Sequence, residues 1–304
     1  MQIRPGDNDD FPAISAAGLK IDARIRPEHM VVARDDDGDI AGYAYCFRSQ
    51  LHHSRYWAGV RVAKHYRRQG LARELLRELG EQRSEPLPFA VKLRSDSNKV
   101  KFVEALGGRI YQVVPASRLA LTDAATLRWA HELVSAVPDI TVVDGTQLTD
   151  AQLVDAWRDI YVWTHAPWSP VTSRDDVVRV FGAEVTLDLA REQSFFALSG
   201  QRIVAAAFAF QGPRSEPLDV VAETVEPSGD SRALEVCVRS AVLAARELGW
   251  RNVTFDCHRD DPHLYPLLRT APHLEGTPLY SMEYDPAGIP DPGNATAEDP
   301  AALM

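Results

Sequence analysis

Three basic side chains and a glycine lie together where an extended segment gives way to a helical one. Lys64, Arg67 and Arg68 precede Gly70 in the segment KHYRRQGLARELL. The first turn of a helix leaves backbone N–H groups without partners, and its dipole favours an anion there. Gly70 and the small Ala72 let an anion approach the backbone. The segment therefore predicts a phosphate-binding loop, although it has neither the Walker sequence nor the G-x-G-x-x-G dinucleotide pattern.

The residues around this loop predict alternating strands and helices. The Asp37-Gly38 turn predicts a hairpin over residues 30–48, and RYWAGVRV predicts the strand that enters the loop. Leucines four residues apart predict a helix over residues 68–80. The segments PFAVKL, SNKVKFVEALGG, RIYQVV and SRLALT then predict a strand, a short helix and two strands. This order indicates an α/β domain, of the α+β type, over residues 1–122.

The loop resembles the Arg/Gln-x-x-Gly-x-Gly/Ala loop that binds the coenzyme A pyrophosphate in GNAT acetyltransferases. Arg67, Gly70 and Ala72 match that spacing, and the order of elements over residues 1–122 is similar to the family's. The resemblance implies acetyl-CoA or another acyl-CoA as cofactor, held partly by the backbone of the preceding strand. The implied contacts are Val60, Arg61, Val62, Arg67, Arg68, Gln69, Gly70, Leu71, Ala72, Arg73, Asp96 and Asn98. For Asp96 and Asn98, helix capping is an equally good interpretation.

The second half of the sequence repeats the order of the first. Aligning Val225 with Val62 places Asp230, Ala233 and Glu235 opposite Arg67, Gly70 and Ala72. Acidic side chains repel a phosphate, so we expect this copy not to bind coenzyme A in the usual way. The chain thus resembles tandem, mycothiol synthase-like GNAT proteins, whose two consecutive domains each have a mixed, mostly antiparallel sheet flanked by helices. The predicted parts are residues 1–122, a connecting helix at 123–139, a degenerate domain at 140–285 and a disordered tail at 286–304.

The acid and base of acyl transfer are harder to place. Many GNAT enzymes have a proton-donating tyrosine four residues before the glycine that closes the second short helix, and Val103 stands there instead. Tyr111 is the nearest tyrosine in sequence and a candidate acid, the alternative being a buried structural ring. His52 and His53 precede the loop strand and are candidate bases, the alternative being exposed loop histidines.

An aromatic segment in the second half is a candidate lining of the acceptor pocket. Trp157, Tyr161 and Trp168 lie in and after a helical stretch, where a core role is equally compatible with the pattern. Cys257, His258 and His263 lack a second matching cluster, so the sequence indicates no metal site.

Composition narrows the class of partner. The chain has 304 residues, a formal net charge of −10 and three widely spaced cysteines. These values favour a cytoplasmic protein that binds a small-molecule amine rather than nucleic acid, and no apolar run predicts a membrane span. We expect an N-acyltransferase, as a monomer formed by a pseudo-dimer of domains or as a homodimer. The alternatives are a non-catalytic acyl-CoA-binding or regulatory protein and an acetyltransferase that acts on a protein.

Overall fold

The computed structural model describes residues 1–132, 137–213 and 215–289, and the chain divides into two compact units. The first unit combines both ends of the chain, Met1–Tyr111 and Tyr280–Met304. The second unit is the continuous segment Gln112–Leu279. Two passages of the chain, at residues 111–112 and 279–280, therefore join the units.

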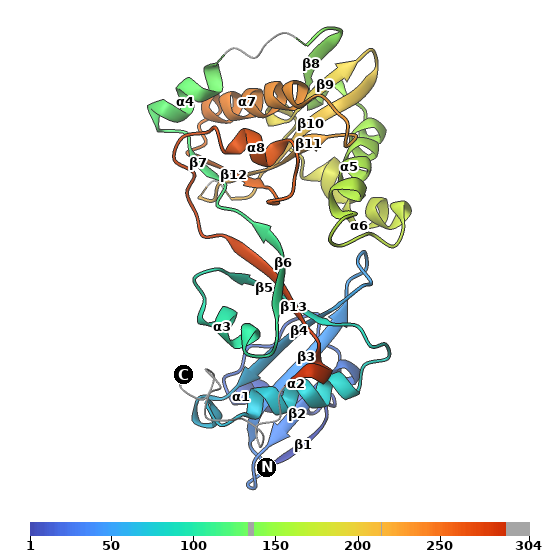
Figure 1. The fold of residues 1–304 in the computed structure, drawn as a ribbon, viewed down its shortest axis with the longest axis vertical. Helices are drawn as coiled ribbons and strands as arrows, with labels where there is room; N and C mark the ends of the chain where they lie inside the picture. The colour runs from blue at the N-terminus through green and yellow to red at the C-terminus, as the bar shows by residue number, and fades with distance from the viewer. Residues whose placement is uncertain (133–136, 214, 290–304) are drawn as a thin grey trace. The chain divides into compact units, whose positions relative to one another are not determined.

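The first unit has a seven-stranded sheet in the order β1-β2-β3-β4-β5-β13-β6 (Figure 1). Neighbouring strands from β1 to β4 run antiparallel, and β4 and β5 run parallel. The strands are β1 (Gln2–Pro5), β2 (Met30–Arg34), β3 (Ile40–Arg48), β4 (Tyr56–Val62), β5 (Phe89–Arg94), β6 (Arg109–Val114) and β13 (Leu279–Tyr284). The helices are α1 (Asp10–Ala16), α2 (Leu71–Glu81) and α3 (Asn98–Glu104).

Alternating apolar residues place these helices on opposite faces of the sheet. Leu71, Leu75 and Leu79 of α2 pack with Val60 and Val62 of β4 in one cluster, which also includes residues of α3. On the other face, α1 packs through Ile14 in a cluster with Tyr43 and Tyr45 of β3. Side chains at odd positions of β4 therefore lie on the α1 side of the sheet, opposite Val60 and Val62.

The second unit has a six-stranded sheet in the order β7-β12-β11-β10-β9-β8. The only parallel pair in this ladder of described strands is β11 with β12. The strands are β7 (Arg118–Ala120), β8 (Ile140–Asp144), β9 (Phe195–Ser199), β10 (Arg202–Phe210), β11 (Leu218–Thr224) and β12 (Asn252–Asp256). The helices are α4 (Ala124–His131), α5 (Asp150–His165), α6 (Arg174–Leu187), α7 (Ser231–Glu247) and α8 (Leu264–Leu268).

Two cores also enclose the second sheet. The long helix α7 packs with Ala205, Ala207 and Ala209 of β10, whose small side chains allow a close approach. On the other face, Trp157 of α5 contacts Phe208 and Phe210 edge-on. Figure 1 shows α7 along one side of this sheet and α5 with α6 on the other. The two predicted mixed, mostly antiparallel sheets flanked by helices are confirmed.

The units exchange a strand, which differs from the predicted boundaries. β7 was expected in the first domain but pairs with β12 of the second unit, through Ala120–Asn252 and its neighbours. In turn, β13 was expected in the second domain and lies between β5 and β6 of the first. The first part of the first unit thus ends at Tyr111 rather than at residue 122, and its second part begins at Tyr280. Sequence order alone does not reveal such an exchange, because each strand has the pattern of an ordinary neighbour.

The predicted tail and connecting helix differ in how far the structure describes them. Residues 286–289 are ordered: Pro286–Gly288 forms a short 3₁₀ helix and Ile289 is buried, which corrects the predicted start of the disordered tail. Residues 290–304 of that tail, and residues 133–136 of the predicted connecting helix, lie outside the described part of the chain. Among the helices that are described, none is long and apolar enough to cross a bilayer.

Candidate functional site

The sheet of the first unit opens between β4 and β5. These parallel strands pair only through Tyr56–Phe89 and Trp57–Ala90, whereas all seven residues of β4 pair with β3. From residue 58 to residue 62, β4 therefore has an edge toward β5 that no strand covers. A free strand edge presents backbone N–H and C=O groups to a ligand.

Two backbone carbonyl groups point outward from this edge of β4. The Val60 carbonyl accepts a hydrogen bond from Arg61 Nη1 (2.9 Å), and the Val62 carbonyl accepts one from Arg67 Nε (3.0 Å). Both valines pack their side chains against the core on the α2 side. The core thus fixes their side chains, while their carbonyls face away from β3. A polar chain lying along β4 could donate hydrogen bonds to these carbonyls.

The loop after β4 has an unusual backbone. Gly70 caps α2 in the left-handed region (φ 86°), and Arg68 also has a positive φ (66°). A non-glycine residue in this region costs roughly 1–2 kcal/mol, and such strain concentrates at binding and catalytic sites. The Gly70 carbonyl accepts the amides of Arg73 (2.8 Å) and Glu74 (3.3 Å), so the helix begins at this glycine. The amides of Leu71 and Ala72 belong to the first turn, which has no intrahelical acceptor for them.

Positive charge is concentrated around the same loop. Residues 40–111 contain 14 lysines and arginines and six aspartates and glutamates, whereas residues 112–279 contain 14 and 23. Arg67, Arg68 and Gln69 are exposed, and Leu71 is buried. Leu71 therefore contributes only backbone at the surface, while the arginines present their charge to solvent. Residues 40–111, unlike the second unit, have the net positive charge that a polyphosphate ligand needs.

The second copy of the loop differs from the predicted alignment. The connection from β11 to α7 spans residues 225–230, two residues shorter than the connection at residues 63–70, and α7 begins at Ser231. Matching the two helix starts places Asp230 opposite Gly70, so the predicted equivalence of Ala233 with Gly70 is wrong. Ala233 is buried in the face of α7, and Glu235 pairs with Arg239 (2.6 Å).

Asp230 gives a better reason for the loss of an anion site in this copy. Its carboxylate accepts the Arg232 amide at the start of α7 (2.9 Å) and pairs with the Arg232 side chain. Hydrogen bonds from Arg232 hold the pKa of Asp230 below its usual value. The carboxylate therefore stays charged and already occupies the helix start where a phosphate would bind.

Tyr111 lies in a charged cluster that involves both ends of the first unit. The Arg55 guanidinium lies over the Tyr111 ring at 4.0 Å, and Glu283 of β13 pairs with Arg55 (2.5 Å) and Arg109 (2.6 Å). Burial raises the pKa of the Tyr111 hydroxyl, while the Arg55 cation and a hydrogen bond with Ser281 act to lower it. Arg55, Ser281 and Glu283 were not predicted from the sequence, because Glu283 is 228 positions from Arg55.

The other predicted residues of the first unit are dispersed. His53 is exposed and its carbonyl accepts a hydrogen bond from Arg48 (2.7 Å), whereas His52 is partly buried. Val103 is buried in the core. Ser97, rather than Asp96 or Asn98, caps α3 by accepting the Lys99 amide (3.3 Å).

The aromatic residues of the second unit fall into two groups. Trp157 is 7% exposed and packs among phenylalanines, so it has the core role that the sequence left open. Tyr161 stacks on His165 (3.9 Å between ring centroids), which in turn contacts Trp168 (4.7 Å). His258 adds a further ring beside Trp168 (4.8 Å). Tyr161 and Trp168 thus share a partly exposed cluster with two histidines, and Phe181 links Tyr161 to Trp157.

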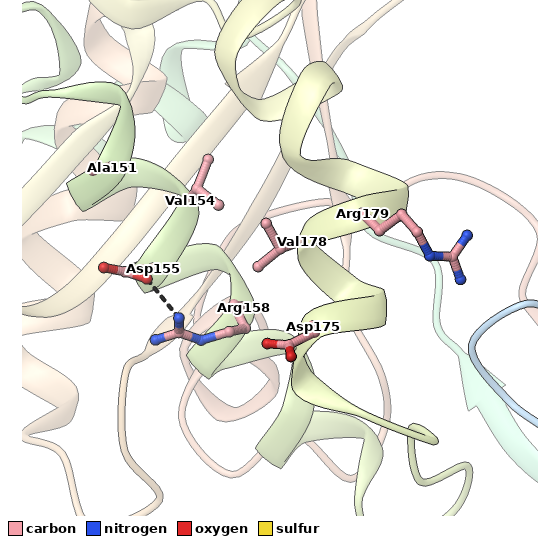
Figure 2. A pocket seen from close by; sticks show the side chains of 7 residues that line it. All are labelled: Ala151, Val154, Asp155, Arg158, Asp175, Val178 and Arg179. Atoms are coloured by element: carbon pink, nitrogen blue, oxygen red, sulfur yellow. Dashed lines mark hydrogen bonds and ion pairs between the residues drawn. The ribbon is translucent and has the colours of Figure 1, made fainter.

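A pocket of about 550 Å³ lies between α5 and α6 (Figure 2). Its lining residues are Ala151, Val154, Asp155, Arg158, Asp175, Val178 and Arg179. Arg158 pairs with Asp155 (2.5 Å) and Asp159 (2.8 Å). The three aromatic residues predicted for an acceptor pocket are not among those that line it. In the described part of the chain, no cluster of three histidine, cysteine or acidic side chains could hold a metal ion.

A comparison with family models matches residues 26–107 to the Acetyltransferase (GNAT) domain. The match covers β2 to α3, which includes the open edge of β4 and the loop at Gly70. A search of curated protein sequences found no significant match.

Solved structures with a similar fold cover nearly the whole chain. A GCN5-related N-acetyltransferase from Sphaerobacter thermophilus has 14% identity and a TM-score of 0.58, over 95% of this chain and 96% of that one. A tandem GNAT protein from the clavulanic acid biosynthesis pathway has 14% identity and a TM-score of 0.51, over 93% and 98%. A GNAT-family acetyltransferase from Colwellia psychrerythraea has 10% identity and a TM-score of 0.50, over 94% and 99%. At these identities the likeness establishes the fold and leaves the substrate open.

Proposed function

We propose that the chain is an N-acetyltransferase of the GNAT superfamily, whose domain matches residues 26–107, and that its first unit binds acetyl-CoA, or a related acyl-CoA, and transfers the acyl group to a small-molecule amine. The observation that carries the proposal is the coincidence of two features. The edge of β4 is open from residue 58 to residue 62, and the strand leads directly into the left-handed Gly70 turn that starts α2. A long ligand with a diphosphate at one end fits both features at once.

The residues of the first unit suit each part of this ligand. The Leu71 and Ala72 amides and the Arg67 and Arg68 side chains would hold the diphosphate. The edge of β4 at Val60 and Val62 would pair with the amide groups of the pantetheine arm. Bound acetyl-CoA would supply an activated thioester, and attack by an amine then needs a neutral nitrogen and a proton for the departing thiolate.

Tyr111 is the candidate donor of that proton. Since burial raises its pKa, its hydroxyl remains protonated at neutral and mildly alkaline pH, as a general acid requires. Arg55 and Ser281 fix the ring and the hydroxyl. His52 and His53 remain candidate bases, and Tyr161 and Trp168 remain candidate contacts of the acceptor.

Tyr111→Phe tests this role. We expect kcat to fall about 100-fold, in the range typical of a lost general acid, with little change in the affinity for acetyl-CoA. Thiol release over a range of pH measures kcat, and the alkaline fall in the wild-type rate should come where the Tyr111 hydroxyl ionises. An unchanged kcat in the variant would show that Tyr111 has only a structural role, as the ring on which the Arg55 guanidinium packs.

One observation favours a second candidate, a protein that binds acyl-CoA without catalysis. Val103 is 4% exposed and packed in the core, so the helix that often carries the family's acid has no proton donor at this place. A protein acceptor is a further alternative to a small amine, and thiol release with protein substrates would distinguish it.

Calorimetric titration with acetyl-CoA, followed by a thiol-release assay with a panel of amines, tests the proposed function. We expect one site per chain, because Asp230 occupies the equivalent helix start in the second unit. Binding without thiol release would favour the non-catalytic candidate, and a stoichiometry of two would contradict our assignment of the second unit.

A further inference from the structure

We propose that the Arg61 side chain binds an anionic group of the acceptor, so that the substrate is an amine that also carries a carboxylate or a phosphate. This inference rests on the proposed function and adds the chemical class of the acceptor. It comes from the position of Arg61 on the open strand, its charge surroundings and its unused hydrogen-bond donors.

Arg61 lies on the α1 side of the open strand. Its neighbours Val60 and Val62 pack with the α2 leucines, so the side chain between them belongs to the opposite face. Its charge acts on Tyr43 and Tyr45 of β3, which form the core on that face with α1. Nη1 also reaches the Val60 carbonyl (2.9 Å). The guanidinium therefore lies beside the uncovered part of β4.

Tyr45 and Gly59 shape this face of the strand. A Cβ atom at Gly59 would lie 2.6 Å from the Tyr45 ring, which shows that the ring covers the backbone at this glycine. Trp57, Gly59 and Arg61 alternate along the same face of β4. Trp57 and Arg61 are partly exposed, so an acceptor that enters from this face would meet an indole ring and a guanidinium next to the open edge.

The charge of Arg61 is not neutralised within the protein. No carboxylate forms an ion pair with it anywhere in residues 1–132, 137–213 and 215–289. Asp22, on whose pKa the Arg61 charge acts, already binds Arg24 through two bonds of 2.9 and 2.7 Å. Those bonds lower the pKa of Asp22 to about 2, so Asp22 and Arg24 together carry no net charge. Arg61 is left as a partly buried, uncompensated cation.

A second cation lies on β5, on the same face of the sheet. Val91 and Leu93 pack in the core on the α2 side, so Lys92 lies on the same face as Arg61. Lys92 is exposed and has no ion pair with any residue of the described segments. Two cations on the two separated strands favour an anion between them, in a chain whose net charge is −10.

The chemistry of the Arg61 guanidinium indicates what it would bind. A guanidinium has five N–H donors in a planar fork that fits a carboxylate or phosphate, and only one contact of Arg61 is with the protein backbone. Binding the anion there would hold the acceptor amine at a fixed distance from the open edge of β4. Acceptors without an anion would lose this contact and with it much of their kcat/KM.

Matched pairs of acceptors test the inference in the unmodified protein. Each common amino acid is compared with its amide, and O-phosphoethanolamine is compared with ethanolamine, by thiol release from saturating acetyl-CoA. We expect the anionic member of the preferred pair to have a kcat/KM about 30-fold higher, the effect of one charge-assisted contact. A preference within the amino acid pairs would indicate a carboxylate, and a preference within the phosphate pair would indicate a phosphate.

Two variants locate the effect. The resemblance implies that the cofactor contacts the backbone of this strand, and Arg61→Gln keeps that backbone, so the variant should remove the preference for the anionic member while the calorimetric affinity for acetyl-CoA stays unchanged. Arg26→Gln removes the same charge from an exposed position of the same unit and should leave the preference intact. Because the acceptor pairs are compared in the wild-type protein first, a poorly folded Arg61 variant would not prevent a decision.

The possible failures differ from one another. Equal rates for anionic and neutral acceptors would overturn the inference while leaving the acyltransferase proposal intact. A loss of acetyl-CoA affinity in Arg61→Gln would assign the side chain to the cofactor instead. Acetyl-CoA binding with no turnover of any acceptor would contradict the proposed function, and the inference would fall with it.

Discussion

Replacing Gly70 by glutamate should lower the affinity for acetyl-CoA by about 100-fold or more, since it introduces a side chain and a like charge where the diphosphate would bind. Gly70 starts α2 with φ of 86°, so a side chain there lies at the helix start that would receive the diphosphate. The substitution also strains the backbone by roughly 1–2 kcal/mol. Calorimetric titration measures the affinity, and urea denaturation measures the separate cost in stability.

Gly249→Glu is a matched control for that backbone strain. Gly249 follows α7 in the second unit and has nearly the same φ (84°), and a Cβ added to it would meet no atom within 4 Å. It should lose similar stability and keep the affinity for acetyl-CoA. If Gly70→Glu bound acetyl-CoA as tightly as Gly249→Glu does, the diphosphate would have to bind elsewhere.

Much of the first unit could be predicted from the sequence because its signals are local. The Asp37-Gly38 turn lies between β2 and β3, and the leucines four apart form the buried face of α2. The helix was predicted over residues 68–80, and α2 runs from Leu71 to Glu81 with Gly70 as its cap. Such features depend on neighbours within a few residues, so periodicity and turn chemistry are enough to find them.

The parts that the sequence did not reveal depend on distant partners. Tyr111 was a candidate by its position, but the Arg55 and Glu283 charges around it come from opposite ends of the chain. The alignment of the second loop failed because the connection to α7 is two residues shorter, and an ungapped comparison cannot show this. A tryptophan at position 157 could line a pocket or pack in the core, and the residue type alone does not distinguish the two. In the structure it packs among phenylalanines.

Removing the C-terminal segment from Tyr280 onward should prevent the first unit from folding. β13 lies between β5 and β6, so without it these two strands lose their common partner. Met282, Tyr284 and Ile289 are 0%, 6% and 5% exposed in the core of this unit. Truncating a large buried residue costs about 2–5 kcal/mol, and three such losses equal or exceed the stability of a typical domain. Hydrogen exchange of the shortened protein should show loss of protection over residues 1–111 and retained protection over 112–279.

The control removes only residues 290–304 and should keep both units protected and acetyl-CoA bound. Two fragments extend the argument to the second unit. Residues 112–279 contain every strand of its sheet and should fold alone, whereas residues 140–285 lack β7 and the buried Leu119, Leu121 and Trp129 and should be less stable. A folded fragment of residues 1–122 that binds acetyl-CoA would show instead that β13 is dispensable. The exchange of β7 and β13 thus makes the folding of the proposed cofactor site depend on a strand that is synthesised after the whole second unit.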